Sequence, residues 1–313
     1  MNEKKLDLLK CEEFIKKAEE IQANFQFKSR LQVIESDVKY STKTGRPFLV
    51  FQLKDTTGQV TCKRFIDTYN NETLEGLQKL FDVGNIFEVI AQFDVKWGYQ
   101  IVDQRLLEEK EFDLNDFVPP SPLDVNALIE LFNETINSIN NQWLKKLLNA
   151  IFEDETLKVK YFECPSAVKY HHPYKFGNLE HTIGMIKIFN ELKSFYNQDT
   201  MLDIDLILTC IILHDIGKIK EYFLNNRIPR KDQVYASIGH IILGDQLVVK
   251  CIEGIKAFPK DLENKIRHMI LSHHGKKEWD SPVEPASSEA ELLHHLDMID
   301  SRFKAEFPRK LYE

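Results

Sequence analysis

Residues Ile204–Lys218 read IDLILTCIILHDIGK, and this stretch decides how the second half of the chain folds. Nearly every position before His214 is apolar, which is typical of a central helix buried on all sides. The pair His214-Asp215 stands at the end of that helix, where a buried charge is costly without a compensating partner. A bound cation would supply that compensation. The stretch therefore predicts a pair of metal ligands inside a helical domain.

Other histidines and aspartates follow at wide intervals and share this setting. Met269 lies one helical turn before His273, and Leu293 lies one turn before Asp297, so both polar side chains are predicted to face a core. Each interval has room for one helix and its connection, so successive helices would bring the ligands together, as in helical bundles. The candidate ligands are His181, His214, Asp215, His240, His273, His274 and Asp297.

For any one of these histidines, an ordinary core or surface position is the simpler interpretation. Two ligand pairs on apolar helices, followed by an inward aspartate, favour a metal site. Imidazole and carboxylate ligands suit manganese, iron, cobalt, nickel or zinc better than calcium. Asp300, one turn after Asp297, is a candidate for orienting a ligand or for a surface ion pair.

The first half of the chain shows the alternating pattern of strands. A charged helix is expected at about Lys5–Ile21, and a short helix at about 73–81. Asp113–Leu123, with three prolines, is expected to be an extended linker. Strands are predicted at 28–37, 48–55, 59–65, 86–93 and 99–102.

The ligand string resembles the HD superfamily of metal-dependent phosphohydrolases, whose central motif is similar to Leu213–Lys218. Gly177–Thr182 resembles the segment that carries the first ligand of that superfamily. The resemblance covers about residues 160–303 and implies two metal ions with Asp215 bridging them. It assigns His181, His214, Asp215 and Asp297 to one ion, and His240, His273 and His274 to the other.

The strand region, at about residues 22–108, resembles an OB-fold barrel, and Leu53–Val60 is similar to the signature of OB domains that bind tRNA anticodons. OB-folds bind single strands through a basic groove and stacking aromatics. Residues 28–64 contain eight basic and three acidic residues, within a chain of net charge −8. Strand aromatics are usually core residues, so Phe51 is expected to be buried, whereas Trp97 and Tyr99 flank a turn at Gly98 and are predicted to be exposed. The candidate nucleic-acid contacts are Lys28, Arg46, Lys63, Arg64, Trp97 and Tyr99.

An OB-fold followed by an HD domain resembles the YhaM-type 3′–5′ exoribonucleases of Gram-positive bacteria. The resemblance extends over nearly the whole chain and includes His171-His172 ahead of the first ligand. It implies a substrate of single-stranded RNA, with single-stranded DNA as a further substrate, and release of nucleoside monophosphates. It also implies divalent ions, Mn²⁺ first, with Co²⁺, Fe²⁺ and Ni²⁺ as alternatives.

Three residues are assigned catalytic roles on this basis. Two ions that share Asp215 would activate a water and hold the scissile phosphate. Lys218 lies one turn after His214 and can reach a phosphate oxygen, although a solvated surface lysine is the alternative. His171 and His172 would contact the nucleotide or protonate the leaving oxygen, with His172 assigned the catalytic role and an ordinary polar loop before Pro173 as the alternative.

Two other functions stay open. One is an HD-type nucleotide or cyclic-dinucleotide phosphodiesterase with a regulatory OB-fold, which would lack the steep salt dependence of a polymer substrate. The other is a non-catalytic protein that binds single-stranded nucleic acid. The complete ligand set argues against it, because a structural metal site needs no open positions.

Composition places the chain among ordinary globular proteins, with 43% hydrophobic and 29% charged residues. Five scattered cysteines without a CxxC pair indicate reduced thiols and a cytoplasmic location. No apolar run reaches 18 residues, so no membrane partner is expected, and a homo-oligomer stays open. The expected organisation is a helix within 1–21, an all-β OB-fold barrel at 22–112, a Pro-rich linker at 113–122 and an all-α HD-type domain at 123–313.

Overall fold

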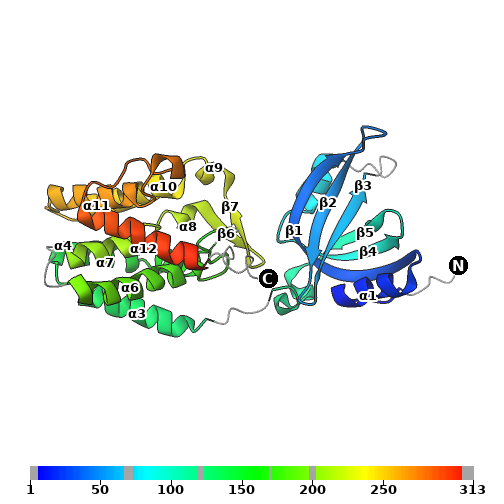
Figure 1. Cartoon of the computed structure of the whole chain (residues 1–313), viewed down its shortest axis with the longest axis horizontal. Helices are drawn as coiled ribbons and strands as arrows, with labels where there is room; N and C mark the ends of the chain where they lie inside the picture. Colours follow the sequence, from blue (N-terminus) through cyan, green and yellow to red (C-terminus); the bar gives the residue numbers. More distant parts are fainter. Residues whose placement is uncertain (1–5, 67–72, 119–122, 169–170, 197–201, 305–313) are drawn as a thin grey trace. The chain divides into compact units, whose positions relative to one another are not determined.

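The computed structural model describes residues 6–66, 73–118, 123–168, 171–196 and 202–304, without the side chains of 194–196. The chain divides into two compact units (Figure 1). The first comprises Met1–Ser121 together with Asn225–Ile228, and the second comprises Pro122–Leu224 together with Pro229–Glu313. The three prolines of the expected linker lie outside the described residues. No helix in the described ranges is long and apolar enough to cross a membrane.

The first unit contains a five-stranded sheet that closes on itself. Its strands pair in the order β1-β2-β3-β5-β4, and β1 also pairs with β4. The β3–β5 pair is parallel and the others are antiparallel. Each predicted strand is confirmed, most of them longer than expected. The strands are β1 (Phe25–Tyr40), β2 (Pro47–Lys54), β3 (Gln59–Phe65), β4 (Ile86–Asp94) and β5 (Gly98–Leu106), with helix α2 (Leu74–Leu80) between β3 and β4.

The barrel interior is filled by alternate strand residues. Phe51 is fully buried, as predicted, and its ring stacks on Phe81 with centroids 4.3 Å apart. Phe81 stacks in turn on Phe87 at 4.5 Å. Phe14, from helix α1 (Cys11–Ile21), packs on Phe27 of β1 at 4.4 Å. These buried rings contribute large apolar areas to the core of the unit.

Two local expectations in this unit are wrong. The first helix begins at Cys11, because the main chain before it pairs with β1 instead: Leu9 N–H donates to Lys28 O at 2.8 Å. The expected linker is not extended throughout, since Leu114–Asp116 (η3) forms a 3₁₀ turn within it. A further 3₁₀ turn, Glu109–Glu111 (η2), lies just before the linker. Phe117 follows and is buried against Ile86, so it belongs to this unit.

The second unit is helical, as expected, except for a β-hairpin whose turn segment, Asn225–Ile228, is grouped with the first unit. Asn226 and Arg227 both have positive φ and form the tight turn that this hairpin requires. The elements are α3 (Val125–Ser138), α4 (Gln142–Phe152), α5 (Glu155–Glu163), α6 (Gly177–Tyr196), α7 (Ile204–Leu213), α8 (Lys218–Glu221), β6 (Tyr222–Asn225), β7 (Ile228–Lys231), α9 (Gln233–Ala236), α10 (His240–Glu253), α11 (Lys260–Ser272), η4 (Lys277–Trp279) and α12 (Ser288–Lys304).

Helix α7 is the centre of this unit, as its apolar sequence predicts. Leu206–Leu213 are all buried, and α7 packs against α4, α6, α11 and α12 (Figure 1). The Asp203 carboxylate caps its start by accepting a hydrogen bond from Leu206 N–H at 3.0 Å. Its other end delivers His214 and Asp215 into the middle of the domain.

Candidate metal centre

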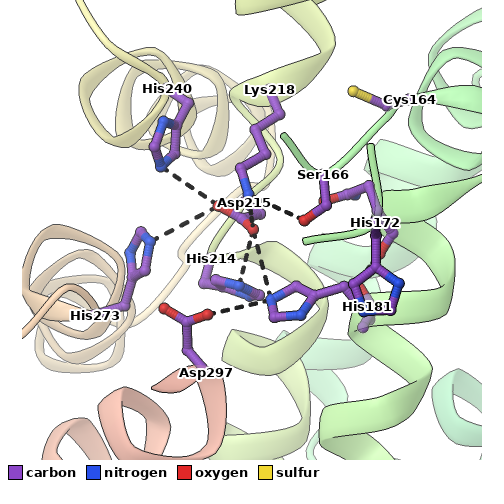
Figure 2. A network of polar contacts seen from close by, with 12 residues as sticks. Cys164, Ser166, His172, His181, His214, Asp215, Lys218, His240, His273 and Asp297 are labelled. Atoms are coloured by element: carbon purple, nitrogen blue, oxygen red, sulfur yellow. Dashed lines mark hydrogen bonds and ion pairs between the residues drawn. The ribbon is translucent and has the colours of Figure 1, made fainter. Parts of the chain in front are cut away.

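Asp215 lies at the centre of the site, and its two oxygens face different histidines (Figure 2). Oδ2 lies 3.1 Å from His214 Nε2 and 3.8 Å from His181 Nε2. Oδ1 lies 3.5 Å from His240 Nε2 and 3.7 Å from His273 Nε2. One carboxylate thus stands between two groups of imidazoles.

The seven candidate ligands come together from five parts of the fold. His181 belongs to the first turns of α6, and His214-Asp215 follows α7. His240 begins α10, His273-His274 follows α11, and Asp297 lies on α12. Within each of three sets, one ligand atom per residue lies within 4.8 Å of the others. The sets are His181, His214 and Asp297; His214, Asp215 and His273; and His240, His273 and His274.

The polar atoms at the centre have no hydrogen-bond partner. They are the Nε2 atoms of His181, His214, His240 and His273 and the Oδ1 atom of Asp215, all buried. Buried polar atoms left unpaired are costly and rare in folded proteins. Divalent cations at this point would satisfy all of them, so the residues fit a metal site.

The other nitrogen of each imidazole is held from behind, which aims Nε2 at the centre. Two of the holding groups are carboxylates, and three are main-chain carbonyls. Nδ1 donates from His181 to Asp300 Oδ2 (2.8 Å), from His214 to Ile211 O (2.8 Å), from His240 to Glu221 Oε2 (3.0 Å), from His273 to Ile270 O (2.7 Å) and from His274 to Trp279 O (2.8 Å).

Close packing of the backbone positions this outer layer. A Cβ atom on Gly184 of α6 would lie 2.2 Å from Asp300 Oδ1 on α12. A Cβ atom on Gly217 would lie 1.9 Å from the carbonyl oxygen of His240. Glycine at these two positions allows the carboxylate and the start of α10 to approach so closely.

The electrostatics favour ionised carboxylates. Burial alone would raise the pKa of Asp215, but the charges of His214 and Lys218 outweigh burial and hold the pKa well below its usual value. Burial and the neighbouring His274 lower the pKa of His273, so that ring is neutral and can donate a lone pair. Burial lowers the pKa of His181, but Asp297 and Asp300 outweigh it and raise it to about 9.

A pocket of about 240 Å³ opens beside these ligands. Lys218 lines it as a buried side chain, not as a solvated surface lysine. Its Nζ donates to Asp215 Oδ2 at 2.5 Å and to Ser166 Oγ at 3.3 Å (Figure 2). The Lys218 ammonium is therefore held at the pocket, beside Asp215.

His172 does not face this pocket, contrary to the role predicted for it. Its side chain is buried and both ring nitrogens are engaged: Nδ1 with Glu180 Oε2 at 3.0 Å and with Tyr174 Oη at 2.9 Å, Nε2 with Asp300 Oδ2 at 2.9 Å. His172 therefore positions Asp300. His171 lines the pocket instead, with its Nε2 unpaired. Burial, followed by the nearby Lys218, lowers the pKa of His171 to about 3.

The candidate nucleic-acid contacts of the barrel differ in solvent exposure and in the contacts that they already make. Trp97 is 51% exposed, as predicted, and Arg46 is exposed. Lys28 is paired with Glu88 at 2.8 Å, and Lys63 donates to the Trp97 carbonyl at 3.1 Å. Arg64 is partly buried on β3.

Tyr99 was wrongly predicted to be an exposed platform. Its ring lies 5.5 Å from that of Phe14 and 5.0 Å from that of Phe93, against the barrel core. Phe65, at 47% exposed and paired with Phe48 across β2 and β3, is the more accessible ring.

Comparisons with known proteins agree with this geometry. A family model for the HD domain matches residues 178–302, and an HD domain implies a divalent metal. The chain is 31% identical to a 3′-5′ exoribonuclease YhaM of Oceanobacillus iheyensis, over 86% of this chain and 82% of that protein. It is 27% identical to the protein of the same name from Bacillus subtilis, over 86% and 83%, and 29% identical to that from Shouchella clausii, over 86% and 82%.

Proposed function

This chain belongs to the family of YhaM 3′-5′ exoribonucleases, and we propose that it is itself a metal-dependent 3′–5′ exoribonuclease acting on single-stranded RNA. One observation carries the proposal. The two oxygens of Asp215 face separate groups of imidazoles whose inward nitrogens have no hydrogen-bond partner. A single carboxylate shared in this way is suited to holding two cations side by side.

The residues divide into two ligand sets around that shared carboxylate. Two divalent ions, with Mn²⁺ favoured, would supply a hydroxide nucleophile at neutral pH and neutralise charge on the phosphate. Asp215 belongs to both sets. His181, His214 and Asp297 complete one set, and His240, His273 and His274 complete the other.

Two further side chains act on the substrate. Lys218 presents its ammonium to a phosphate oxygen in the pocket, where low solvent exposure strengthens the attraction. His171 offers an unpaired Nε2 to the same pocket. With a pKa of about 3, its ring is neutral at pH 7, so His171 hydrogen-bonds the nucleotide and is a poor proton donor.

The barrel is proposed to be an OB-fold that holds the strand. The strand order, with its parallel β3–β5 pair and its closing β1–β4 pair, supports this assignment. Single strands bind such barrels through backbone charge and base stacking. The contacts proposed here are Arg46, Lys63, Arg64 and Trp97. Lys28 is left out because its ion pair with Glu88 already neutralises part of its charge.

The direct test uses RNA labelled at one end and incubated with each divalent ion. With a 5′ label, products should shorten step by step; with a 3′ label, a labelled nucleoside monophosphate should appear first. Single-stranded DNA of the same sequence is expected to be a second substrate. Elemental analysis after manganese loading should give about two ions per chain. Internal cleavage, or hydrolysis of a cyclic dinucleotide without shortening of RNA, would overturn the proposal.

A further inference from the structure

We propose that Trp279 and Arg302 form a subsite for the terminal nucleotide of the substrate, with its base stacked on the Trp279 indole. The inference rests on the proposed function. Both residues line the pocket that also contains Asp215, Lys218 and Asp297. At about 240 Å³ the pocket is small for a ligand site, so it suits a terminal nucleotide better than a longer strand.

The indole is held in a fixed place beside the metal ligands. Trp279 ends the short 3₁₀ helix η4, and its carbonyl oxygen accepts the hydrogen bond from His274 Nδ1 at 2.8 Å. The indole lies beside the ring of His294, with centroids 5.9 Å apart and planes 31° apart. His294 is itself buried and bonds to the carbonyl of His273 at 2.8 Å. Trp279 is nevertheless 40% exposed, so part of its surface is free for a ligand.

Charge around the indole matches a nucleotide. The Lys276 ammonium lies 5.1 Å from the ring centroid. Among the described residues, neither Lys276 nor Arg302 has an ion-pair partner. An exposed cation–π contact is weaker than the stacking of a base, so an entering base can displace the ammonium toward the phosphate. Met298 adds apolar surface to the same pocket.

Binding can be measured apart from catalysis. Titration of the metal-loaded protein with AMP should quench tryptophan fluorescence, whereas ribose 5-phosphate, which has no base, should quench it weakly. Trp279→Phe should abolish the AMP-dependent quenching. The matched control is Trp143→Phe, because Trp143 packs against Phe258 and does not line the pocket. Quenching that persists in Trp279→Phe would overturn the subsite.

Kinetics give a second test with matched substrates. Trp279→Ala should lower kcat/KM for ordinary RNA about 5- to 150-fold, the range expected for one stacked base. For RNA whose 3′-terminal nucleotide lacks a base, the same substitution should cost little. Arg302→Met should raise KM on both substrates. Metal content should be unchanged in both variants, because the main-chain carbonyl of residue 279, which accepts the hydrogen bond from His274 Nδ1, is kept in each.

An equal penalty on ordinary and abasic RNA would show that Trp279 is structural and not a base platform. The proposed function fails separately from the subsite. A wild-type protein that never shortens RNA, but whose Trp279 still reports AMP binding, would remove the exonuclease proposal and leave the nucleotide site standing.

Discussion

Asp215 differs from the other candidate ligands in its central position, which is proposed to bridge the two ions. Each of its oxygens lies within 4 Å of two imidazole nitrogens, whereas Asp297 has one such contact, 3.3 Å from His181. An amide keeps the shape of this side chain but offers only one good ligand oxygen. Removal of the shared carboxylate should therefore affect both halves of the site.

Asp215→Asn is expected to reduce RNA hydrolysis by more than about 100-fold, beyond the 10- to 100-fold typical of changes behind the ligands. The helices should form as before, since the substitution preserves volume. Turnover, metal content and circular dichroism should be measured on one preparation. Full activity with full metal content would contradict a bridging carboxylate.

Glu221 is one of the groups that hold the candidate ligand imidazoles from behind, and its substitution tests that role. Its Oε2 accepts hydrogen bonds from His240 Nδ1 at 3.0 Å and from His240 N–H at 2.8 Å, while its Oε1 pairs with Lys231 at 2.7 Å. Glu221→Gln should lower the affinity for one of the two ions by about 10- to 100-fold and leave the affinity for the other unchanged. Manganese titration followed by equilibrium dialysis measures this difference.

Lys231→Met is the matched control, because it removes the ion pair on Oε1 without touching His240. Equal losses in the two variants would show that the ion pair between Glu221 and Lys231, and not the hydrogen bond to His240, matters for the ion.

The sequence predicts ligands well where a helix repeat fixes the direction of the side chain. His273 and Asp297 follow apolar residues at helical spacing, and both face the site. His171 and His172 lie in a loop before Pro173, and His172 has a φ of +46°. No repeat determines which of the two rings turns toward the pocket there, so the sequence did not separate His171 from His172, and the catalytic role was assigned to His172.

At the scale of elements, hydrophobic periodicity predicted the strands and the central helix α7, but it did not predict where the first helix begins. Alternation marked β2 and β3, and a continuous apolar run marked α7. The residues before Cys11 look helical in sequence, but hydrogen bonds with Lys28 in β1 hold them extended. Long-range pairing of that kind overrides local propensity. In the same way, the contact of the Tyr99 ring with Phe14 overrides the exposure expected from its place beside a turn.

Glu88 of β4 links three strands and has a pH-dependent effect. It pairs with Lys28 and Arg30 on β1 and with Arg105 on β5. The hydrogen bond from Lys28 lowers the pKa of Glu88 more than burial raises it, and Arg30 lowers it further. A carboxylate with a depressed folded-state pKa stabilises the fold above its unfolded pKa, and that contribution disappears as the pH falls through the folded value.

Glu88→Gln should therefore destabilise the barrel by about 1 kcal/mol near pH 7, a modest amount because its partners are more than one third exposed. The difference from the wild type should close as the pH falls below about 4. Urea unfolding, monitored by hydrogen exchange in peptides from β4, measures this difference in stability. A difference that is constant from pH 7 to pH 3 would exclude the Glu88 charge as its origin.

At the scale of the whole molecule, the two units suggest a division of work between chemistry and affinity. The candidate ligands and the pocket all belong to the second unit, whereas the basic stretch 28–64, with eight basic and three acidic residues, belongs to the first. Residues Asn225–Ile228 are grouped with the first unit, so a fragment that begins at Pro122 would lose the packing of that segment. Substitutions in the full-length chain therefore test the division better than truncation does.

Replacing Arg46 and Lys63 together by glutamate should weaken the hold on long RNA without changing the chemistry. Each lost phosphate contact should reduce the slope of log affinity against log salt by about 0.7. KM for a long single strand should therefore rise at low salt and approach the wild-type value at high salt, while kcat on a dinucleotide stays constant. The control is Lys79→Glu with Lys110→Glu, which changes the net charge equally at two exposed lysines outside the strands. If both double variants behave alike, the effect is one of overall charge. If neither changes KM at any salt concentration, the barrel does not hold the substrate, and the affinity must come from the helical unit alone.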